Sequence, residues 1–403
     1  MANIIKLPQQ SWYEPRELEL PLPDNWQFEV CNMAGYNRPA LSDDQIKAAI
    51  TNPIGSPRIR DMARGKKEVV IIFDDIHRVT RVAKIAPFVI EELAEAGIPD
   101  SNIRFIAATA NHGAMNRIDF AKKLGEAIMA RFPIYNHNPY ENCTYVGTTS
   151  RGTKVSINTE VMNCDLKIAI NSTQPHITHV FSGGGKIIVP GVASIDTTFA
   201  NHTLQISEKG NYETNELRLD ADEAAKLAGL DMVIEGVYNL WGETVALFAG
   251  EPVAAHTASV QEAKSHYLMP RAKDKDIVIA NSYTKVTESV AALSTAVSLS
   301  EKGGDFVLIC NAIQGQVVHY LVGPWGKTIQ GRMELFPLPV PPHVNHLILY
   351  TEYPDIASHG YLEKSDKVMP MSNWDEVIRK LQAFHKDGAS VAVYPNGDIP
   401  CLS

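Results

Sequence analysis

The sequence has few cysteines, and no two of them are closely spaced. Its 403 residues include Cys31, Cys143, Cys164, Cys310 and Cys401, and no Cys-x-x-Cys pair occurs. An odd and scattered set of cysteines excludes a disulfide framework and a zinc knuckle, and it is typical of thiols that stay reduced inside the cell. We therefore expect a cytoplasmic protein.

Long apolar runs and an excess of positive charge are also missing. No apolar run reaches the roughly 18 residues that a membrane-spanning helix needs. The N-terminus, Met1 to Lys6, shows neither the long apolar core nor the cleavage site of a secretory signal. The formal net charge of −9 argues against a large binding surface for nucleic acid or an anionic membrane. We expect neither nucleic acid nor a membrane among the partners.

Two standard catalytic motifs are absent, as are internal repeats and low-complexity segments. A Walker A loop needs a glycine five residues before Gly185 and a serine or threonine after the lysine, but this chain has Val180 and Ile187 there. No His-Glu-x-x-His zinc motif occurs either. The sequence thus offers neither a P-loop nor a zincin site.

Apolar strand patterns alternate with helical patterns along the chain. The strands are expected at 68–73, 103–108 and 166–171, with helices at 83–96 and 119–131 between them, and Ser42 with Gln45 predicts a helix start. After a linker-like stretch at about 254–275 the pattern resumes, with strands at 277–280, 305–310, 347–350 and 391–394 and helices at 287–299 and 374–385. This alternation predicts an α/β fold with mostly parallel sheets.

The length of the chain exceeds the size at which one core keeps growing, so two α/β domains are expected. We place the first at 1–268 and a smaller second one at 269–403, with the main cleft between them. In such folds ligands bind beyond the carboxyl ends of the strands. Asp75, His112 and His176 each follow a predicted strand end, so this rim is the candidate site.

A short polar segment follows the first of these strands. Arg78 offers a guanidinium that can bind a carboxylate or phosphate through two hydrogen bonds, and Asp75 could orient it or accept a hydrogen bond from a ligand hydroxyl. The alternative is a solvated Asp/Arg pair in a loop. We expect His77 to take no part in catalysis, and His137, His343 and His346 to be structural.

The stretch from Gln174 to Gly191 combines histidines, three consecutive glycines and a lysine. Three glycines indicate either positive φ or a close approach to the backbone. Lys186 follows them directly and offers a nucleophilic amine, while His176 and His179 titrate near neutral pH or could bind a metal. The alternative is a tight turn between two strands with surface histidines.

Several separated motifs together resemble the nickel-dependent lactate racemase family. In order they are Asp75-x-x-Arg78, the Ala-Thr-Ala-Asn-His112 loop, His176, Ser182-Gly-Gly-Gly-Lys186, Pro190-Gly191 and Asn201-His202. The match in order and spacing covers most of the first domain. It makes the first domain the catalytic one that anchors a cofactor, and the second domain the one that closes the cleft.

The resemblance implies a nickel pincer cofactor, nickel-pyridinium-3,5-bisthiocarboxylate mononucleotide, which separate cofactor-synthesis proteins make. Lys186 matches the lysine joined covalently to one arm, and His202 matches the histidine that completes the nickel coordination. The residues that would contact the cofactor or the substrate carboxylate are Asp75, Ile76, His77, Arg78, Gly184 and Gly185. The three glycines would let the cofactor lie against the backbone.

The resemblance also implies the reaction, racemisation or epimerisation of a 2-hydroxy acid. His112 and His176 match the paired acid/base histidines, one for each substrate orientation. One histidine takes the hydroxyl proton while hydride leaves the α-carbon for the cofactor, and return of hydride to the opposite face inverts the centre. Arg78 would hold the carboxylate while the ketone turns.

The chain departs from the family pattern in places that bear on substrate choice. The Gln and Lys that the family carries in the second domain align with Ala291 and Ser294, its loop arginine with Gly113, and its proline after Arg78 with Val79. These changes remove positive charge and enlarge the cleft. We therefore expect a 2-hydroxy acid other than lactate, or a larger one.

Two other functions are compatible with the same residues. His112, His176 and His202 could bind zinc in a lyase or hydrolase. Alternatively, the chain could be a non-catalytic protein that binds a small acid or nucleotide. Metal analysis separates the first from a racemase, which requires nickel and a mass adduct on Lys186.

Overall fold

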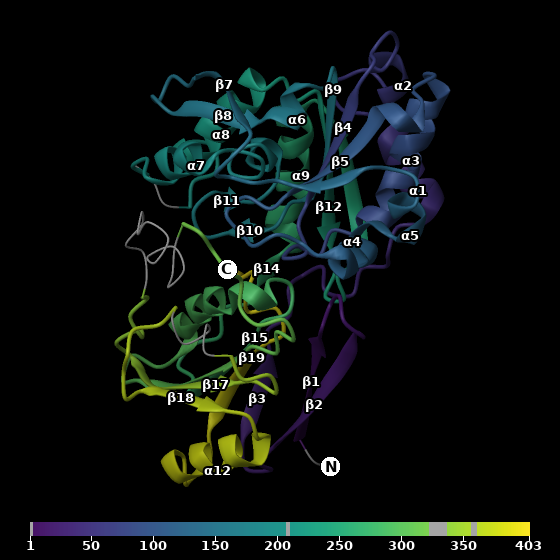
Figure 1. Ribbon diagram of the computed structural model, residues 1–403. Helices are drawn as coiled ribbons and strands as arrows, with labels where there is room; N and C mark the ends of the chain where they lie inside the picture. Colours follow the sequence, from purple (N-terminus) through teal and green to yellow (C-terminus); the bar gives the residue numbers. More distant parts are fainter. Residues whose placement is uncertain (1–2, 207–209, 322–336, 356–360) are drawn as a thin grey trace. The chain divides into compact units, whose positions relative to one another are not determined.

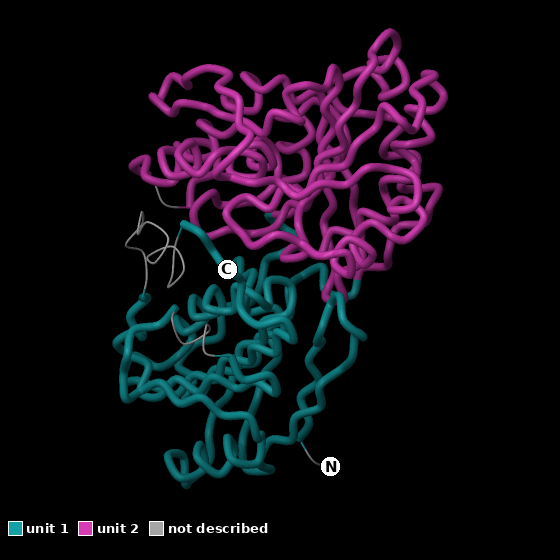
Figure 2. Tube along the Cα trace, in the orientation of Figure 1, with its two compact units in different colours: residues 1–37, 264–403 teal, residues 38–263 magenta. Residues whose placement is uncertain are grey.

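The computed structural model describes residues 3–206, 210–321, 337–355 and 361–403 (Figure 1). The chain divides into two compact units, one formed by residues 38–263 and the other by residues 1–37 together with 264–403 (Figure 2). Each unit contains a six-stranded, mostly parallel sheet. The predicted α/β fold is therefore confirmed. Among the described residues, no helix combines the length and apolar character needed to cross a bilayer.

The sheet of residues 38–263 has the strand order β13-β12-β9-β4-β5-β6. Its strands are β4 (Val69–Asp74), β5 (Ile103–Ala108), β6 (Ile134–Asn136), β9 (Leu166–Ser172), β12 (Met232–Tyr238) and β13 (Thr244–Gly250). Neighbouring strands are parallel except β12 and β13. Every residue of β4, β9 and β12 is buried, which explains their near-continuous apolar runs.

Short helices and two hairpins complete this part of the chain. The helices are α1 (Asp43–Thr51), α2 (Ile59–Met62), α3 (Val82–Glu95), η1 (Asp100–Asn102), α4 (Arg117–Leu124), α5 (Glu126–Met129), α6 (Thr159–Met162), η2 (Gly184–Ile187), α7 (Ile195–His202), α8 (Glu216–Leu227) and α9 (Pro252–His266). The hairpins pair β7 (Cys143–Thr148) with β8 (Lys154–Asn158) and β10 (Pro175–His176) with β11 (Val180–Phe181).

Two expectations about these helices are wrong. The helix predicted at 119–131 is divided into α4 and α5 at Gly125, whose φ of +80° breaks the helical path. The linker expected at 254–275 is mostly the helix α9. Its buried side chains include His256 and Ser259 as well as Val260, so no regular apolar stripe marks the helix in the sequence.

The start of α1 is as predicted. Gln45 donates its backbone N–H to Oγ of Ser42 at 3.3 Å, and Ser42 donates its own N–H to Oε1 of Gln45 at 2.9 Å. This reciprocal pair is a capping box, which satisfies two backbone groups at the helix start.

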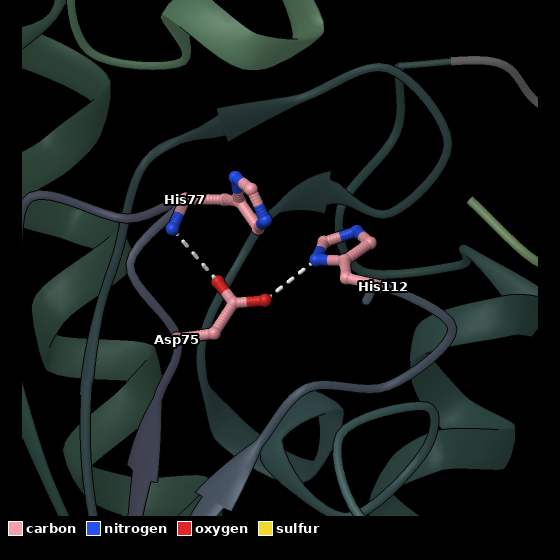
Figure 3. A group of neighbouring side chains, drawn as sticks. All are labelled: Asp75, His77 and His112. Atoms are coloured by element: carbon pink, nitrogen blue, oxygen red, sulfur yellow. Dashed lines mark hydrogen bonds and ion pairs between the residues drawn. The ribbon is translucent and has the colours of Figure 1, made fainter. Parts of the chain in front are cut away.

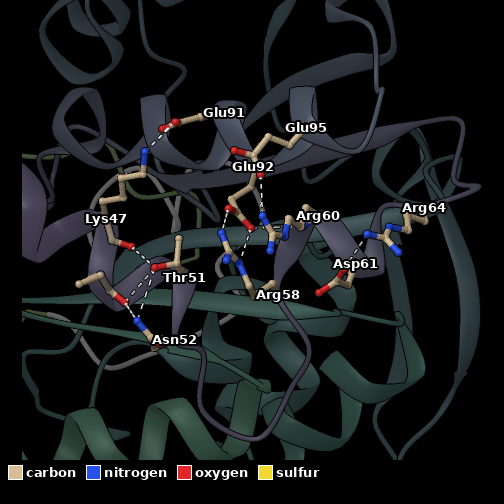
Figure 4. Close-up of polar contacts among 11 residues, drawn as sticks. Lys47, Thr51, Asn52, Arg58, Arg60, Asp61, Arg64, Glu91, Glu92 and Glu95 are labelled. Atoms are coloured by element: carbon tan, nitrogen blue, oxygen red, sulfur yellow. Dashed lines mark hydrogen bonds and ion pairs between the residues drawn. The ribbon is translucent and has the colours of Figure 1, made fainter.

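Ion pairs connect α1 and the α2 segment to α3 (Figure 4). Lys47 contacts Glu91 at 2.7 Å, with both side chains almost half exposed. Arg58 donates through two guanidinium nitrogens to Glu92, whose side chain is only 3% exposed. Because a buried carboxylate needs such partners, the Arg58 pair matters more to the packing of α3 than the exposed Lys47 pair.

The other unit has the strand order β18-β17-β16-β15-β19-β3, with all neighbours parallel. Its strands are β3 (Gln27–Val30), β15 (Ile277–Asn281), β16 (Gly304–Ile309), β17 (Val344–Tyr350), β18 (Val368–Met371) and β19 (Ser390–Tyr394), and its helices include η3 (Val286–Ser298) and α12 (Trp374–Phe384). Two further pairs are β1 (Asn3–Gln9) with β2 (Arg16–Leu22) and β14 (Leu268–Met269) with β20 (Cys401–Leu402).

The N-terminal residues differ from the expected domain 1–268. Residues 1–37 group with the C-terminal part of the chain because β3 pairs with β19. Leu7 of β1 and Leu20 of β2 also join the apolar core that contains Ile279 and Val391. The division after Ala263 lies close to the expected one after residue 268.

Candidate active site

The loop that follows β4 holds a carboxylate against an imidazole (Figure 3). Oδ2 of Asp75 lies 2.6 Å from Nδ1 of His112, and the backbone N–H of His77 donates to Oδ1 of Asp75 at 3.0 Å. The rings of His77 and His112 meet edge to face with centroids 4.9 Å apart. Asp75 and His112 are buried, and His77 is half-buried. β4 and β5 pair side by side, which brings the loops after them together.

The electrostatics of this cluster keep Asp75 ionised. Burial raises the pKa of the Asp75 carboxyl, but the charges of His112, His77 and Arg78 and the hydrogen bond from His112 outweigh burial, and the net pKa lies well below its usual range. The ionised carboxylate accepts a hydrogen bond from Nδ1 of His112, so in the neutral form of that ring Nε2 carries the lone pair. Asp75 therefore fixes the orientation of the His112 ring.

Arg78 donates from Nη1 to the backbone oxygen of His77 at 2.9 Å, and its charge contributes to the low pKa of Asp75. The backbone oxygen of Arg78 accepts from Nζ of Lys123 at 2.8 Å. Lys123 is fully buried and forms an ion pair with Asp74 at 2.8 Å. This support for the loop was missed, because a lysine inside a short helix gives no sequence signal of burial.

A second cluster surrounds Lys186. Its Nζ lies 3.1 Å from Nε2 of His176, so a proton can pass between the two groups. The rings of His176 and His179 have centroids 5.4 Å apart, as do those of His179 and His202. β10, the turn between β10 and β11, and α7 thus place His176, His179 and His202 in a row, and η2 places Lys186 beside His176.

Two of these imidazoles are held neutral. Burial, with a smaller effect from the charge of Lys186, lowers the pKa of His202 to about 3. Burial also lowers the pKa of His179 well below its ordinary value, and Lys186 and His202 add to the effect. His202 donates from Nδ1 to the backbone oxygen of Thr198 at 3.0 Å. Its Nε2 therefore carries a lone pair, as a metal ligand requires.

The three glycines before Lys186 pack against the protein itself. Gly183 and Gly184 have φ of +103° and +56°. A Cβ atom at Gly183 would lie 2.8 Å from Oε1 of Glu235, one at Gly184 would lie 2.7 Å from Cδ2 of His256, and one at Gly185 would lie 2.6 Å from the oxygen of Ala221. Neighbouring protein atoms thus require the small size of all three glycines, and the predicted contact of Gly184 and Gly185 with a cofactor stays a prediction.

A buried carboxylate fixes this turn. Glu235 accepts the backbone N–H of Gly184 and contacts Nδ1 of His256 at 2.7 Å. Burial lowers the pKa of His256, but the charge and hydrogen bond of Glu235 outweigh it and raise the pKa overall. Sequence reasoning missed this pair. The available signal was a glutamate within the otherwise apolar strand β12.

All the predicted site residues lie in the unit of residues 38–263. Ala110, in the loop before His112, donates its N–H to the oxygen of Gly191 at 3.0 Å, which ties that loop to the segment after Lys186. The zinc trio of His112, His176 and His202 is not brought together. In the described part of the chain, the one trio of metal-ligating groups within 4.8 Å is Asp75, His77 and His112.

Comparisons with known proteins agree with these motifs. The family profile described as "Lactate racemase N-terminal domain" matches residues 13–214. The lactate racemase of Thermoanaerobacterium thermosaccharolyticum is 30% identical over 329 residues, which cover 78% of this chain and 76% of that protein. The lactate racemase of Lactiplantibacillus plantarum is 26% identical over 421 residues, covering 96% and 97%.

Two solved structures share the fold. The lactate racemase apoprotein from T. thermosaccharolyticum aligns over all of both chains with a TM-score of 0.73 at 23% identity. A protein from Thermotoga maritima aligns over 91% of this chain and all of its own, with a TM-score of 0.65 at 18% identity. The profile match and the sequence relatives establish the lineage, so the chain belongs to the lactate racemase family of isomerases.

Proposed function

We propose that this isomerase inverts the carbinol carbon of a 2-hydroxy acid, with His112 and His176 as its two acid/base groups. The observation that carries the proposal is the placement of the two histidines: Asp75 orients the ring of His112, and His176 lies beside the amine proposed to anchor the cofactor. Asp75 lies 2.6 Å from Nδ1 of His112, and Lys186 lies 3.1 Å from Nε2 of His176. A racemase needs a base for each of two substrate orientations, and this unit provides two that suit the task.

Family membership implies a nickel-containing cofactor, and the donor set of the Lys186 cluster fits one. We propose that Lys186 forms the covalent bond to the pincer nucleotide and that Nε2 of His202 ligates the nickel. A neutral imidazole beside soft sulfur ligands suits a square-planar nickel ion. His202 is held neutral with Nε2 available, as this role needs. When bound, the cofactor supplies a hydride acceptor for the substrate α-carbon.

The chain's own residues bind the substrate and move its proton. Arg78 follows Asp75 on the loop after β4 and would hold the carboxylate through two parallel hydrogen bonds. Nε2 of His112 would take the hydroxyl proton of one enantiomer, and the Asp75 carboxylate would stabilise the imidazolium that forms. His176 would perform the same step for the other enantiomer, giving the planar 2-oxo acid in either case.

The test is intact mass together with nickel content, after expression in a host that makes the cofactor. The wild-type chain is expected to carry a covalent adduct on the peptide that contains Lys186 and a stoichiometric amount of nickel. Lys186→Met should carry neither and should be inactive. Lys84→Met, at an exposed position of α3, is the matched control and should retain both. Full activity in a wild-type chain that lacks the adduct would overturn the proposal.

We propose that the substrate differs from lactate or is larger. Gly113 follows His112 directly, and it leaves space where the family pattern has an arginine. We expect kcat/KM for at least one longer or bulkier 2-hydroxy acid to exceed that for lactate by about tenfold or more, the usual effect of filling a pocket with added methylene groups. The measurement is a turnover screen of enantiopure hydroxy acids. If lactate is the best substrate by a wide margin, the prediction is wrong.

Cofactor loading and the free cysteines indicate the partners and the compartment of the protein. The cofactor-synthesis proteins are the expected partners, because loading Lys186 requires a cofactor made elsewhere. All five cysteines are free thiols, which fits the reducing cytoplasm that we propose as the compartment.

A further inference from the structure

His77 stands beside the Asp75–His112 pair, and the proposed proton transfers do not use its ring. Its backbone N–H fixes Oδ1 of Asp75 at 3.0 Å, while Oδ2 of the same carboxylate lies 2.6 Å from His112. The His77 ring meets the His112 ring edge to face at 4.9 Å. Figure 3 shows the two imidazoles on the same side of the carboxylate.

These three side chains have the chemistry and spacing of a metal site. Each offers one ligand atom, and the three atoms lie within 4.8 Å of one another. Zinc binds imidazole nitrogen and carboxylate oxygen at about 2.0–2.2 Å, so neighbouring ligands in a tetrahedral site are about 3.4 Å apart. Atoms that lie within 4.8 Å of one another need to shift by at most about 1.4 Å to reach that spacing.

We propose that Asp75, His77 and His112 bind a divalent transition-metal cation such as Zn²⁺, at ligands distinct from Lys186 and His202. The cation takes the place of the proton that lies between Asp75 and Nδ1 of His112, so binding releases that proton. Three protein ligands leave a fourth coordination position for water. The loops after the paired strands β4 and β5 carry all three ligands, Asp75 and His77 on the first and His112 on the second.

Occupation of this site would block racemisation, and this consequence alone rests on the proposed function. A cation on His112 would prevent the ring from being oriented by Asp75 as a base. Zn²⁺ should therefore inhibit the loaded enzyme, whereas Zn²⁺ binding itself is measured on the full chain from a host without the cofactor. A cofactor-loaded chain that racemises no 2-hydroxy acid would refute the proposed function, whereas Zn²⁺ binding by the cofactor-free chain would leave the metal site standing.

The experiment is competition for Zn²⁺ against a chromophoric chelator at neutral pH, with thermal unfolding as a second readout. The wild-type chain is expected to bind Zn²⁺ and to gain thermal stability from it. His77→Gln and His112→Gln should each weaken binding by about tenfold or more and lose the stabilisation. His202→Gln should leave the affinity unchanged.

The chain offers a matched control in a second cluster of one aspartate and two histidines. Asp305 contacts Nδ1 of His346 and Nε2 of His385, each at 2.8 Å, through opposite carboxylate oxygens. The ligand atoms of this second cluster do not all lie within 4.8 Å of one another, as those of Asp75, His77 and His112 do. His346→Gln should therefore bind Zn²⁺ as the wild type does. Unchanged affinity in His77→Gln, or equal loss in His77→Gln and His202→Gln, would overturn the proposed site.

Discussion

Replacing His112 with alanine is expected to lower kcat/KM for both enantiomers by about 10²–10⁴, the usual contribution of a general acid–base group. The imidazole is buried and is oriented by Asp75 at 2.6 Å. Water that replaced it would be a much weaker base. Because the two enantiomers have equal free energies, kcat/KM must fall by the same factor in both directions. The measurement is racemisation of each enantiomer by the loaded variant, followed by polarimetry or chiral separation.

A single-turnover experiment distinguishes a lost base from a damaged fold. His112→Ala should still form the 2-oxo acid from the one enantiomer that His176 deprotonates, and His176→Ala should form it only from the other. Both variants should keep nickel and the Lys186 adduct, since neither residue is proposed to hold them. Formation of the 2-oxo acid from both enantiomers by His112→Ala would show that His112 is not the base for either.

Much of the fold could be predicted from the sequence because its central strands are buried on both faces. β4 and β9 are apolar for this reason, and their runs are visible without any partner. The parts that could not be predicted depend on pairing across long sequence distances. β3 pairs with β19 more than three hundred residues away, and no local pattern encodes that pairing. α9 was missed because its buried face includes His256.

The candidate site was also predictable from the sequence only where it depends on local patterns. The sequence placed Asp75 and His112 after strands that proved to be neighbours, so their proximity was predictable. It did not identify His112 as the hydrogen-bond partner of Asp75, because that contact depends on the path of the loop. The packing of Gly183 and Gly184 against Glu235 and His256 was equally hidden, since these residues lie on β12 and α9.

Acid is expected to destabilise the unit of residues 38–263 through His137. Burial lowers the pKa of this imidazole to about 4, and its hydrogen bond to the oxygen of Ala193 raises it only in part. Nε2 of His137 lies 2.9 Å from that oxygen, and Nδ1 lies 3.2 Å from the amide nitrogen of Asn158. The neutral ring donates to the first and accepts from the second. A protonated ring would place two N–H groups against each other at Asn158.

The direction of this change in stability follows from how the folded and unfolded chains bind protons. In the unfolded chain His137 takes up a proton near pH ~6.5, whereas the folded chain resists it until pH ~4, so stability falls as the pH drops through this window. The loss is about 2 kcal/mol by pH ~5 and about 3 kcal/mol by pH ~4. Urea unfolding of the wild type and of His137→Gln at several pH values measures it. The glutamine amide can make both hydrogen bonds but cannot take up a proton in this range. The stability of the wild type relative to His137→Gln should therefore fall by those amounts on acidification, and parallel pH curves would show that His137 is not the group responsible.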